Sequence, residues 1–400
     1  MKAYFILFVL FFSSISLNTL AQKENYKLID TPRISYLSTI GNDSIVSLPI
    51  VYKKDGVILF TVTIDGKEYV FVFDTGATTC LISKEISIND SSVKTITYQD
   101  GFGNENKADL VLKNYKIGYS SFNNIPTIVS DLKLLNELGC IKIDGIIGAN
   151  LINLCNWQID PQKQIISFSK LPFKSSTDNS SKLKLEYTSN GLPHIKLSYD
   201  EIPFYALVDF GFAGYLNLNK AFLKKSKKIK KIKTIKGMGS HSLSVSNEIK
   251  GNIFHTTLDT LIFSDNLKFP NIPINFDEVG PILGSSFFNR FVTILNAPSK
   301  ELILITQSEE YTNSKFFPIR FGLNNLNELI INFIWETDEM KQSGVQIGQK
   351  VLRINDKIFN KISKSDFCEL KNYLTEITNI KITVQMENEI KELELTKTVN

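Results

Sequence analysis

The chain has 400 residues, of which 43% are hydrophobic and 22% are charged, and its formal net charge is +4 at pH 7. A chain of this length exceeds the usual size of one hydrophobic core, so two or three domains are expected. The small net charge, and aromatic residues that do not interleave with a basic stripe, exclude a nucleic-acid-binding surface of the usual kind.

The first 21 residues have the pattern of an export signal. Lys2 gives a positive start, residues 4–12 form an apolar run, and a small-residue cleavage site ends at Ala21. The run is well short of the roughly 20 apolar residues that a membrane-spanning helix needs. We therefore expect residues 1–21 to be cleaved and the mature protein, without a transmembrane segment, to be exported to the periplasm or the cell exterior.

One sequence pattern then occurs twice, 135 residues apart. An apolar run of β-forming residues leads into Asp74 and a glycine turn, and a second run leads into Asp209 and a similar turn. Further along each copy, two apolar residues precede a glycine. This glycine is Gly148, 74 residues after Asp74, in the first copy and Gly284, 75 residues after Asp209, in the second. Landmarks that recur in one order at nearly one spacing indicate an internal duplication.

Each copy also has a close pair of glycines between these landmarks, Gly101 with Gly103 and Gly237 with Gly239. Each copy ends with two strand-like runs joined by a proline-containing turn. Short strands with turns dominate both copies, and long segments of helical period are few. The predicted fold class is therefore mostly β, with two β lobes.

Eight lysines lie between Lys224 and Lys236, after the second aspartate loop. Such a run could bind an acidic partner, but charge runs usually form a solvated face. We interpret this one as the exposed side of a surface helix.

A third set of predicted elements begins near Asn313. A Phe-Gly-Leu loop at residues 321–323 precedes a strand at 329–334, and a glycine-rich turn leads into a strand that ends in Ile-Asn-Asp at residue 356. A helix over Ser365–Leu374 and a strand over 380–386 complete the unit. This order resembles a small α+β PDZ domain, which implies a C-terminal peptide as a possible ligand. The chain is then expected to divide into a signal peptide at 1–21, an N-terminal lobe at 22–175, a C-terminal lobe at 176–312 and the PDZ-like unit at 313–400.

An apolar strand that ends in an aspartate requires an explanation, because burying a carboxylate is costly unless the group is paired or hydrogen-bonded. Two such loops that face each other provide one, since two adjacent carboxyl groups share a proton more easily than they both ionise. The ionised carboxyl can then take a proton from water while the protonated one polarises a peptide carbonyl. The glycine after each loop aspartate lets backbone pass close to backbone.

Residues 57–307 resemble the two-lobed aspartic peptidases, of the pepsin and retropepsin kind, in a single-chain form. The motif at Asp74–Ala77 matches the family's active site, and the segments ending at Gly148 and Gly284 match those that pass beneath each aspartate loop. The resemblance implies pseudo-twofold-related lobes, a peptide or unfolded protein as substrate, and glycine pairs at the tips or turns of flap hairpins. The site residues it implies are the catalytic Asp74 and Asp209, with the supporting loop residues Thr75, Gly76, Ala77, Phe210 and Gly211.

The second loop departs from this family at Phe210, where a threonine or serine hydroxyl would bond to the backbone of the other loop. Two hypotheses follow. The chain is either an exported aspartic endopeptidase that uses Asp74 and Asp209, or a catalytically silent peptide-binding protein in which Asp209 only caps local backbone. Pairing of Asp74 with its counterpart in a second chain is disfavoured, because the chain has a second lobe of its own.

Other chemistries are not indicated. The three histidines, His194, His241 and His255, lack the spacing of metal ligands, and the segment around Gly237 lacks the third glycine of a dinucleotide loop. No metal or cofactor is therefore expected.

Four cysteines are present at positions 80, 140, 155 and 368, and none shows a Cys-x-x-Cys spacing. An oxidising compartment would permit a bridge between Cys140 and Cys155. Free thiols buried in apolar runs are equally compatible with the sequence.

Overall fold

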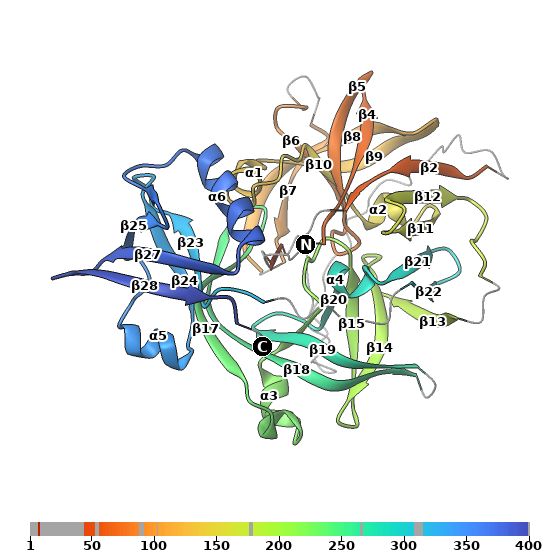
Figure 1. Ribbon diagram of the computed structural model, residues 1–400. Coiled ribbons are helices and arrows are strands. Elements are labelled where there is room, and N and C mark those ends of the chain that lie inside the picture. The colour runs from red at the N-terminus through yellow and green to blue at the C-terminus, as the bar shows by residue number, and fades with distance from the viewer. Residues whose placement is uncertain are drawn as a thin grey trace.

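The computed structural model describes residues 7–8, 44–52, 56–87, 92–101, 103–175, 179–264, 267–307 and 315–398. The predicted export signal, apart from residues 7–8, and the predicted boundaries near residues 176 and 312 lie outside these ranges. The division of the chain into domains and its export therefore stay predictions. Strands dominate the described residues (Figure 1), which confirms the mostly β fold class.

The first copy forms a six-stranded barrel with two further strands. The eight strands are β3 (Val51–Tyr52), β4 (Ile58–Ile64), β5 (Lys67–Phe73), β6 (Cys80–Ser83), β7 (Lys94–Gln99), β8 (Glu105–Ile117), β9 (Ser120–Ser130) and β10 (Gly145–Ile147). They pair in the order β3-β4-β5-β10-β6-β9-β8-β7, and β4 also meets β8 at Thr63 and Lys116, which closes the barrel. Alternate residues of the second half of β8 point inward, as expected for a strand with one buried face.

Six strands of the second copy pair in the corresponding order. They are β14 (Pro193–Tyr199), β15 (Ile202–Asp209), β20 (Ile282–Gly284), β16 (Leu216–Asn219), β19 (Leu267–Asp277) and β18 (Glu248–Ser264), and β14 meets β18 at Ser198 and Ile262. A seventh strand, β17 (Ile235–Leu243), extends β18 as β7 extends β8. The sequence repeat thus corresponds to a repeated pairing order within a large mixed sheet, whereas the two-lobe arrangement stays a prediction.

The ends of the two copies lie side by side in one run of strands. Its order is β2 (Val46–Pro49), β12 (Ile165–Ser169), β11 (Asn156–Asp160), β21 (Phe291–Asn296), β22 (Glu301–Thr306) and β13 (Ser180–Tyr187). The largest apolar cluster of the molecule draws on both copies, and it includes Phe73, Trp157 and Phe210. The two copies therefore share one core.

Short helices and one two-residue strand complete this part of the chain. They are α1 (Lys133–Leu138), α2 (Ala149–Ile152), α3 (Ala221–Lys225), a 3-10 turn (Ile229–Lys231), α4 (Ser285–Phe288) and β1 (Leu7–Phe8), which pairs with β17. The predicted surface helix of the lysine run is present as α3 and the 3-10 turn, and most of its lysines are exposed.

Residues 316–398 form a unit with an apolar cluster of its own. Its elements are β23 (Ile319–Leu323), β24 (Leu329–Trp335), α5 (Asp338–Ser343), β25 (Lys350–Ile354), β26 (Lys357–Ile358), α6 (Lys364–Glu376), β27 (Asn379–Gln385) and β28 (Ile390–Thr396). Ser363 caps α6, since its hydroxyl accepts from the amide of Asp366. The predicted helix and the three predicted strands are confirmed, the second of them ending at Ile354 before the Asn-Asp turn. The Phe-Gly-Leu segment belongs to β23 instead of a loop, and the PDZ arrangement stays a prediction.

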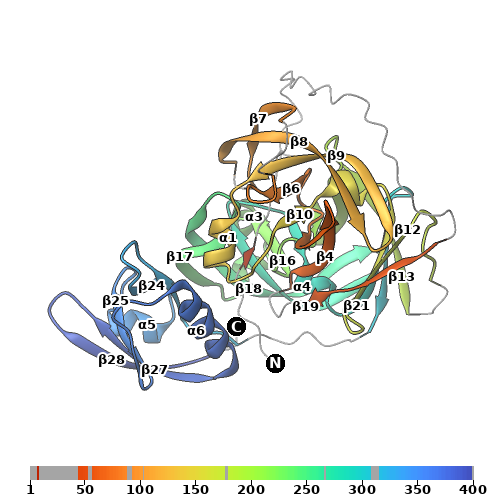
Figure 2. The same cartoon turned by 90° about the horizontal axis from the view of Figure 1, so that it is seen from above.

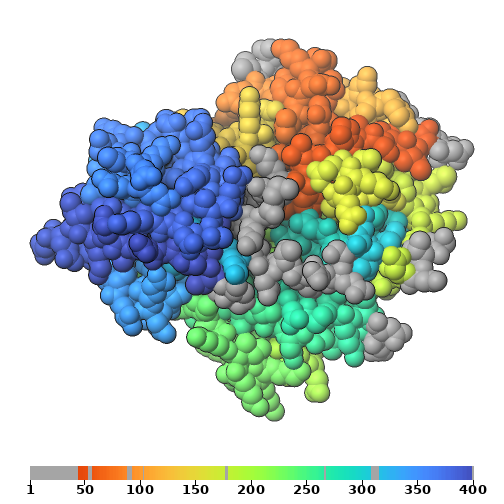
Figure 3. Space-filling view, in the orientation of Figure 1, coloured from red at the N-terminus to blue at the C-terminus, as the bar shows by residue number. Residues whose placement is uncertain are grey.

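This C-terminal unit lies to one side of the barrel, next to α1 and β17 (Figures 2 and 3). β24 pairs with β17, placing Gly237 opposite Trp335 and Gly239 opposite Phe333. A disulfide joins Cys140, just after α1, to Cys368 in α6. The C-terminal unit is therefore tied to the first copy by a covalent bond and to the second by strand pairing.

Of the two alternatives that the sequence left open for these cysteines, the bridge between Cys140 and Cys155 is wrong, because Cys140 is bonded to Cys368. Cys155 is a free thiol with no exposed surface, and it belongs to the shared core. Cys140 is half-buried at the end of α1, where it faces α6 and Cys368. Cys155 packs in the shared core, whereas Cys140 packs against the apolar cluster of the C-terminal unit, so proximity in sequence did not predict the bond. Cys80, the fourth cysteine, is free and buried.

The two glycine pairs occupy different places in their hairpins. Gly101 and Gly103 lie in the turn between β7 and β8, as expected. Gly237 and Gly239 instead lie within β17, so their expected place at a hairpin tip is wrong. A Cβ at Gly239 would lie 2.2 Å from the carbonyl oxygen of Asn332, so glycine is needed there for the close approach of β24.

Candidate active site

Two aspartate loops lie at the ends of corresponding strands. Asp74 directly follows β5, and Asp209 ends β15. The later glycine segments pair in parallel with these strands, with Ile147 opposite Phe73 and Gly284 opposite Asp209. Because each strand is flanked on both sides, it carries its aspartate into the interior, and neither side chain has exposed surface.

The backbone of each loop holds one oxygen of its own aspartate. Asp74 Oδ1 accepts hydrogen bonds from the amides of Gly76 (2.8 Å) and Ala77 (2.9 Å). Asp209 Oδ1 accepts from the two corresponding amides of its loop, at 2.8 and 3.1 Å. The second oxygen of each carboxyl group, Oδ2, has no hydrogen-bond partner among the described residues. These two oxygens are thus the ones left for chemistry.

Each loop packs against the carboxyl group of the other loop. A Cβ at Gly76 would lie 2.4 Å from Asp209 Oδ2, and a Cβ at Gly211 would lie 2.3 Å from Asp74 Cγ. Only glycine leaves room for these approaches. The structure therefore brings together all seven residues that the sequence motif singled out, and the two carboxyl groups are neighbours.

A single hydroxyl joins the loops. Thr75 Oγ1 donates to the carbonyl of Val208 (2.7 Å) and accepts from the amide of Phe210 (3.1 Å). The reciprocal bonds cannot form because position 210 has no hydroxyl. In the part of the chain that the structure describes, the amide of Thr75 has no hydrogen-bond acceptor.

The ring of Phe210 takes a different role from the missing hydroxyl. It is completely buried, and its centroid lies 5.8 Å from that of Phe73 in the first copy and 4.8 Å from that of Phe288 in α4. Aromatic packing of this kind stabilises an interface through both buried area and ring geometry. The ring thus joins the two copies through aromatic contacts.

Burial and proximity change the acidity of the pair. Burial, and then the neighbouring Asp209 carboxyl, raise the pKa of Asp74 well above its usual value. Burial raises the pKa of Asp209 to about 7, although amide hydrogen bonds oppose the change. The pair consequently holds one proton over a pH range in which an exposed aspartate is ionised.

The three histidines do not join this site, and each has a local partner. His194 Nδ1 bonds to Leu192 O, His241 Nδ1 to Ser242 Oγ, and His255 Nδ1 to Asn275 Oδ1. In the described ranges, no three or more His, Cys, Asp or Glu side chains are grouped so that they could hold a metal ion.

Sequence analysis did not single out Asp100, Ser244 or Ser246, which connect the turns of the β7–β8 and β17–β18 hairpins. Aspartate and serine are common in turns, so nothing in the local sequence distinguished these residues. Ser244 and Ser246 lie 144 and 146 residues after Asp100 along the chain. Only the fold brings them into contact with it.

Comparison with known proteins supports the class of site for one part of the chain. Residues 60–151 match the Aspartyl protease family. This range contains the first aspartate loop and most of the barrel, and a protease family implies peptide substrates. No curated protein matches the chain. Within the described residues, none of the helices has the length and apolar character needed to cross a membrane.

Proposed function

We propose that this protein is an exported aspartic endopeptidase that hydrolyses peptide bonds with Asp74 and Asp209. The observation that carries the proposal is the reciprocal packing of the two aspartate loops, in which the glycine of each loop touches the carboxyl group of the other. The match of residues 60–151 to the Aspartyl protease family supports the role of the first loop. The repeated strand order supports a second lobe that supplies Asp209.

The chemistry follows from the unequal protonation of the pair. The ionised carboxyl takes a proton from a water molecule, while the protonated carboxyl donates to the oxygen of the peptide carbonyl. The attack of water gives a tetrahedral gem-diol intermediate. The first carboxyl then gives its proton to the leaving amine as the C–N bond breaks, while the second carboxylate takes back a proton from a hydroxyl of the intermediate, which restores the pair. The two Oδ2 atoms, which are free of other hydrogen bonds among the described residues, perform these transfers.

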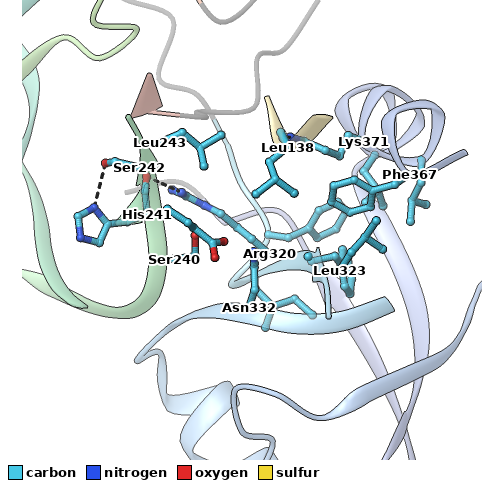
Figure 4. Close-up of a pocket in the computed structure, with 17 residues that line it drawn as sticks. Leu138, Ser240, His241, Ser242, Leu243, Arg320, Leu323, Asn332, Phe367 and Lys371 are labelled. Atoms are coloured by element: carbon cyan, nitrogen blue, oxygen red, sulfur yellow. Dashed lines mark hydrogen bonds between the residues drawn. The ribbon is translucent and has the colours of Figure 1, made fainter. Parts of the chain in front are cut away.

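A peptide ligand for the C-terminal unit forms part of the proposal. A mostly apolar pocket lies between β23, α6 and β17, with Leu323, Phe367 and Leu374 among its lining residues (Figure 4). Arg320 extends from β23 across this pocket, and its Nη1 donates to the carbonyl of His241 (3.5 Å). A cationic group beside an apolar groove suits the carboxylate and last side chain of a peptide C-terminus.

The alternative is a catalytically silent peptide-binding protein. It is favoured by Phe210, which removes one of two loop-to-loop hydroxyl contacts, and by the complete burial of both carboxyl groups. Under this alternative the protein binds an extended peptide between its two predicted lobes without cleaving it.

Incubation of residues 22–400 with a denatured protein mixture from pH 3 to 8, with and without a pepstatin-type transition-state mimic, distinguishes the two. We expect cleavage that the mimic inhibits and that Asp74→Asn abolishes. Peptide binding without turnover at any pH would establish the silent binder instead.

A further inference from the structure

Asp100 connects the two hairpins that extend from β8 and β18. This aspartate lies in the turn between β7 and β8, and only 1% of its surface is exposed. Its Oδ1 accepts from the backbone and side-chain nitrogens of Asn104, at 2.9 and 3.1 Å, within the same turn. Its Oδ2 accepts from the hydroxyls of Ser244 and Ser246, both at 2.8 Å, in the turn between β17 and β18. One carboxyl group therefore holds both turns.

Each turn is also organised internally, so the contact between them is fixed in geometry. In the first turn the amide of Gly103 donates to the carbonyl of Asp100. In the second, the amide of Ser244 donates to the carbonyl of Asn247, whose own amide donates to Ser244 Oγ. Burial alone would raise the pKa of Asp100, but hydrogen bonds from Asn104 and Ser244 hold it below the usual value, so the carboxylate is the ionised, stronger acceptor.

The second hairpin contributes apolar side chains to a cluster that includes residues of both aspartate loops. Leu243 and Val245 are 5% and 2% exposed, and they belong to one apolar cluster with Ala77 and Ala213. Ala77 lies directly after the glycine of the first loop, and Ala213 lies two residues after that of the second. Neither catalytic carboxyl has exposed surface. Leu7 and Phe8, within the predicted export signal, also pair with Ser242 and Leu243 at this end of the hairpin, so in the mature chain the hairpin itself is the element there that can open or close over the loops.

The same hairpin has a fixed base. Its first strand pairs with β24 of the C-terminal unit through Gly237 and Gly239. The register of β17 against β18 then shifts between Ser240 and Ser242. Because paired strands resist bending and an irregularity tolerates it, the tip can move about this point while the base stays with β24.

We propose that Asp100, with Ser244 and Ser246, forms a latch that holds the two hairpins closed over the aspartate pair, and that its release admits the peptide. That the admitted molecule is a peptide rests on the proposed function, whereas the latch between the hairpins does not. Asp100 is here a positioning residue, because it acts through the hairpins and does not touch the reacting atoms.

Hydrogen exchange of the full mature chain, without any substrate, tests the latch directly. Ser246→Ala removes one donor to Asp100 and the hydroxyl that accepts from Asn106 and Asn247, and it leaves the bonds between Asp100 and Asn104 in the first turn in place. We expect the amides of Gly103 and Asn104, in the other hairpin, to exchange about tenfold faster or more, as well as those of Ser244 and Asn247. Asp100→Asn should have the same effect on both turns.

Thr95→Val is the matched control. Thr95 Oγ1 also donates to a carboxylate, Asp109 (3.0 Å), but both residues belong to the first hairpin and are exposed. This variant should leave exchange in the second turn unchanged. If Asp100→Asn does not fold, Ser246→Ala alone still decides the matter. Unchanged exchange at Gly103 in Ser246→Ala would overturn the latch.

The activity assay separates this proposal from the previous one. If the chain is a peptidase, Ser246→Ala should lower KM for a peptide or raise kcat/KM, since less of the protein is closed, and leave the dependence on Asp74 intact. Faster exchange in both turns without turnover in any variant would remove the peptidase proposal and leave the latch standing.

Discussion

The two aspartate loops have nearly the same backbone contacts but different neighbours after the aspartate. Thr75 in the first loop makes two hydrogen bonds to the second, whereas Phe210 in the second loop makes none with its side chain and packs against aromatic rings of both copies. The carboxyl groups keep matching amide bonds and matching glycine contacts despite this difference. The comparison indicates that the arrangement of the pair depends on the glycines and amides, and that one hydroxyl bridge is sufficient when a ring fills the place of the other.

The largest effect is expected where the loops are equivalent. Asp74→Asn and Asp209→Asn should each lower kcat by about 10²–10⁴-fold, because one carboxyl group cannot act as both acid and base in a cycle. Circular dichroism and thermal unfolding should show that both variants fold. Asp109→Asn, an exposed aspartate of the first hairpin, is the control and should keep full activity. Turnover that persists in Asp209→Asn would show that the loops are not equivalent.

The next effect concerns the position where the loops differ. Phe210→Thr should lower the free energy of unfolding by about 3–5 kcal/mol, since the ring is completely buried and its loss leaves a cavity. A new hydroxyl could reach the amide of Thr75, but one hydrogen bond contributes only about 1 kcal/mol. Urea unfolding of Phe210→Thr and of the milder Phe210→Leu measures the difference. A threonine variant that is more stable and faster would show that Phe210 is a defect of the second loop.

The two copies also differ in how they hold the C-terminal unit, by a disulfide in the first and by β17 in the second. Replacing Cys140 and Cys368 together with alanine should lower the free energy of unfolding by about 2–4 kcal/mol, because the bond closes a long loop in the unfolded chain. A dithiol reductant should lower the melting temperature of the natural protein and not that of the variant. Detection of two free thiols at these positions in the non-reduced protein would remove this difference between the copies.

These links also bear on whether residues 22–312 can fold alone. A readily separable C-terminal unit would have few contacts across the boundary near residue 312. Three links cross it, namely the disulfide, the pairing of β24 with β17, and the bond from Lys371 Nζ to the carbonyl of Leu138 (2.8 Å). The separability of the two parts stays a prediction. A fragment without the C-terminal unit should keep its barrel, but the amides of β17 that face β24 should lose their protection from hydrogen exchange.

The sequence was sufficient for features encoded by short motifs. The aspartate loops and the glycine segments beside them were predicted because an apolar run, an aspartate and a glycine turn specify a strand that ends in the interior. Contacts between distant segments carry no such signal. The bond between Cys140 and Cys368, the bonds of Asp100 with two serines, and the need for glycine at position 239 all depend on elements more than 90 residues apart. The fold alone brings these residues together.

The smallest effect expected is the dependence of stability on pH, which shows whether the loops share a proton. Burial raises the pKa of Asp209 to about 7, above the value of about 3.9 in an unfolded chain. The folded protein therefore keeps a proton that the unfolded chain releases, and the associated stability is complete below pH 4 and is lost as the pH rises to about 7.

Asp209→Asn cannot ionise at this position, so its free energy of unfolding should fall less over this pH range than that of the natural protein. Urea titrations at pH 4, 5.5, 7 and 8 measure both curves, and Asp109→Asn should follow the natural protein at every pH. The same flattening is expected for Asp74→Asn, because burial and the Asp209 carboxyl raise the pKa of Asp74 as well. Parallel curves for all variants would mean that neither carboxyl holds a proton near neutral pH, and the pair could not then act as acid and base in turn.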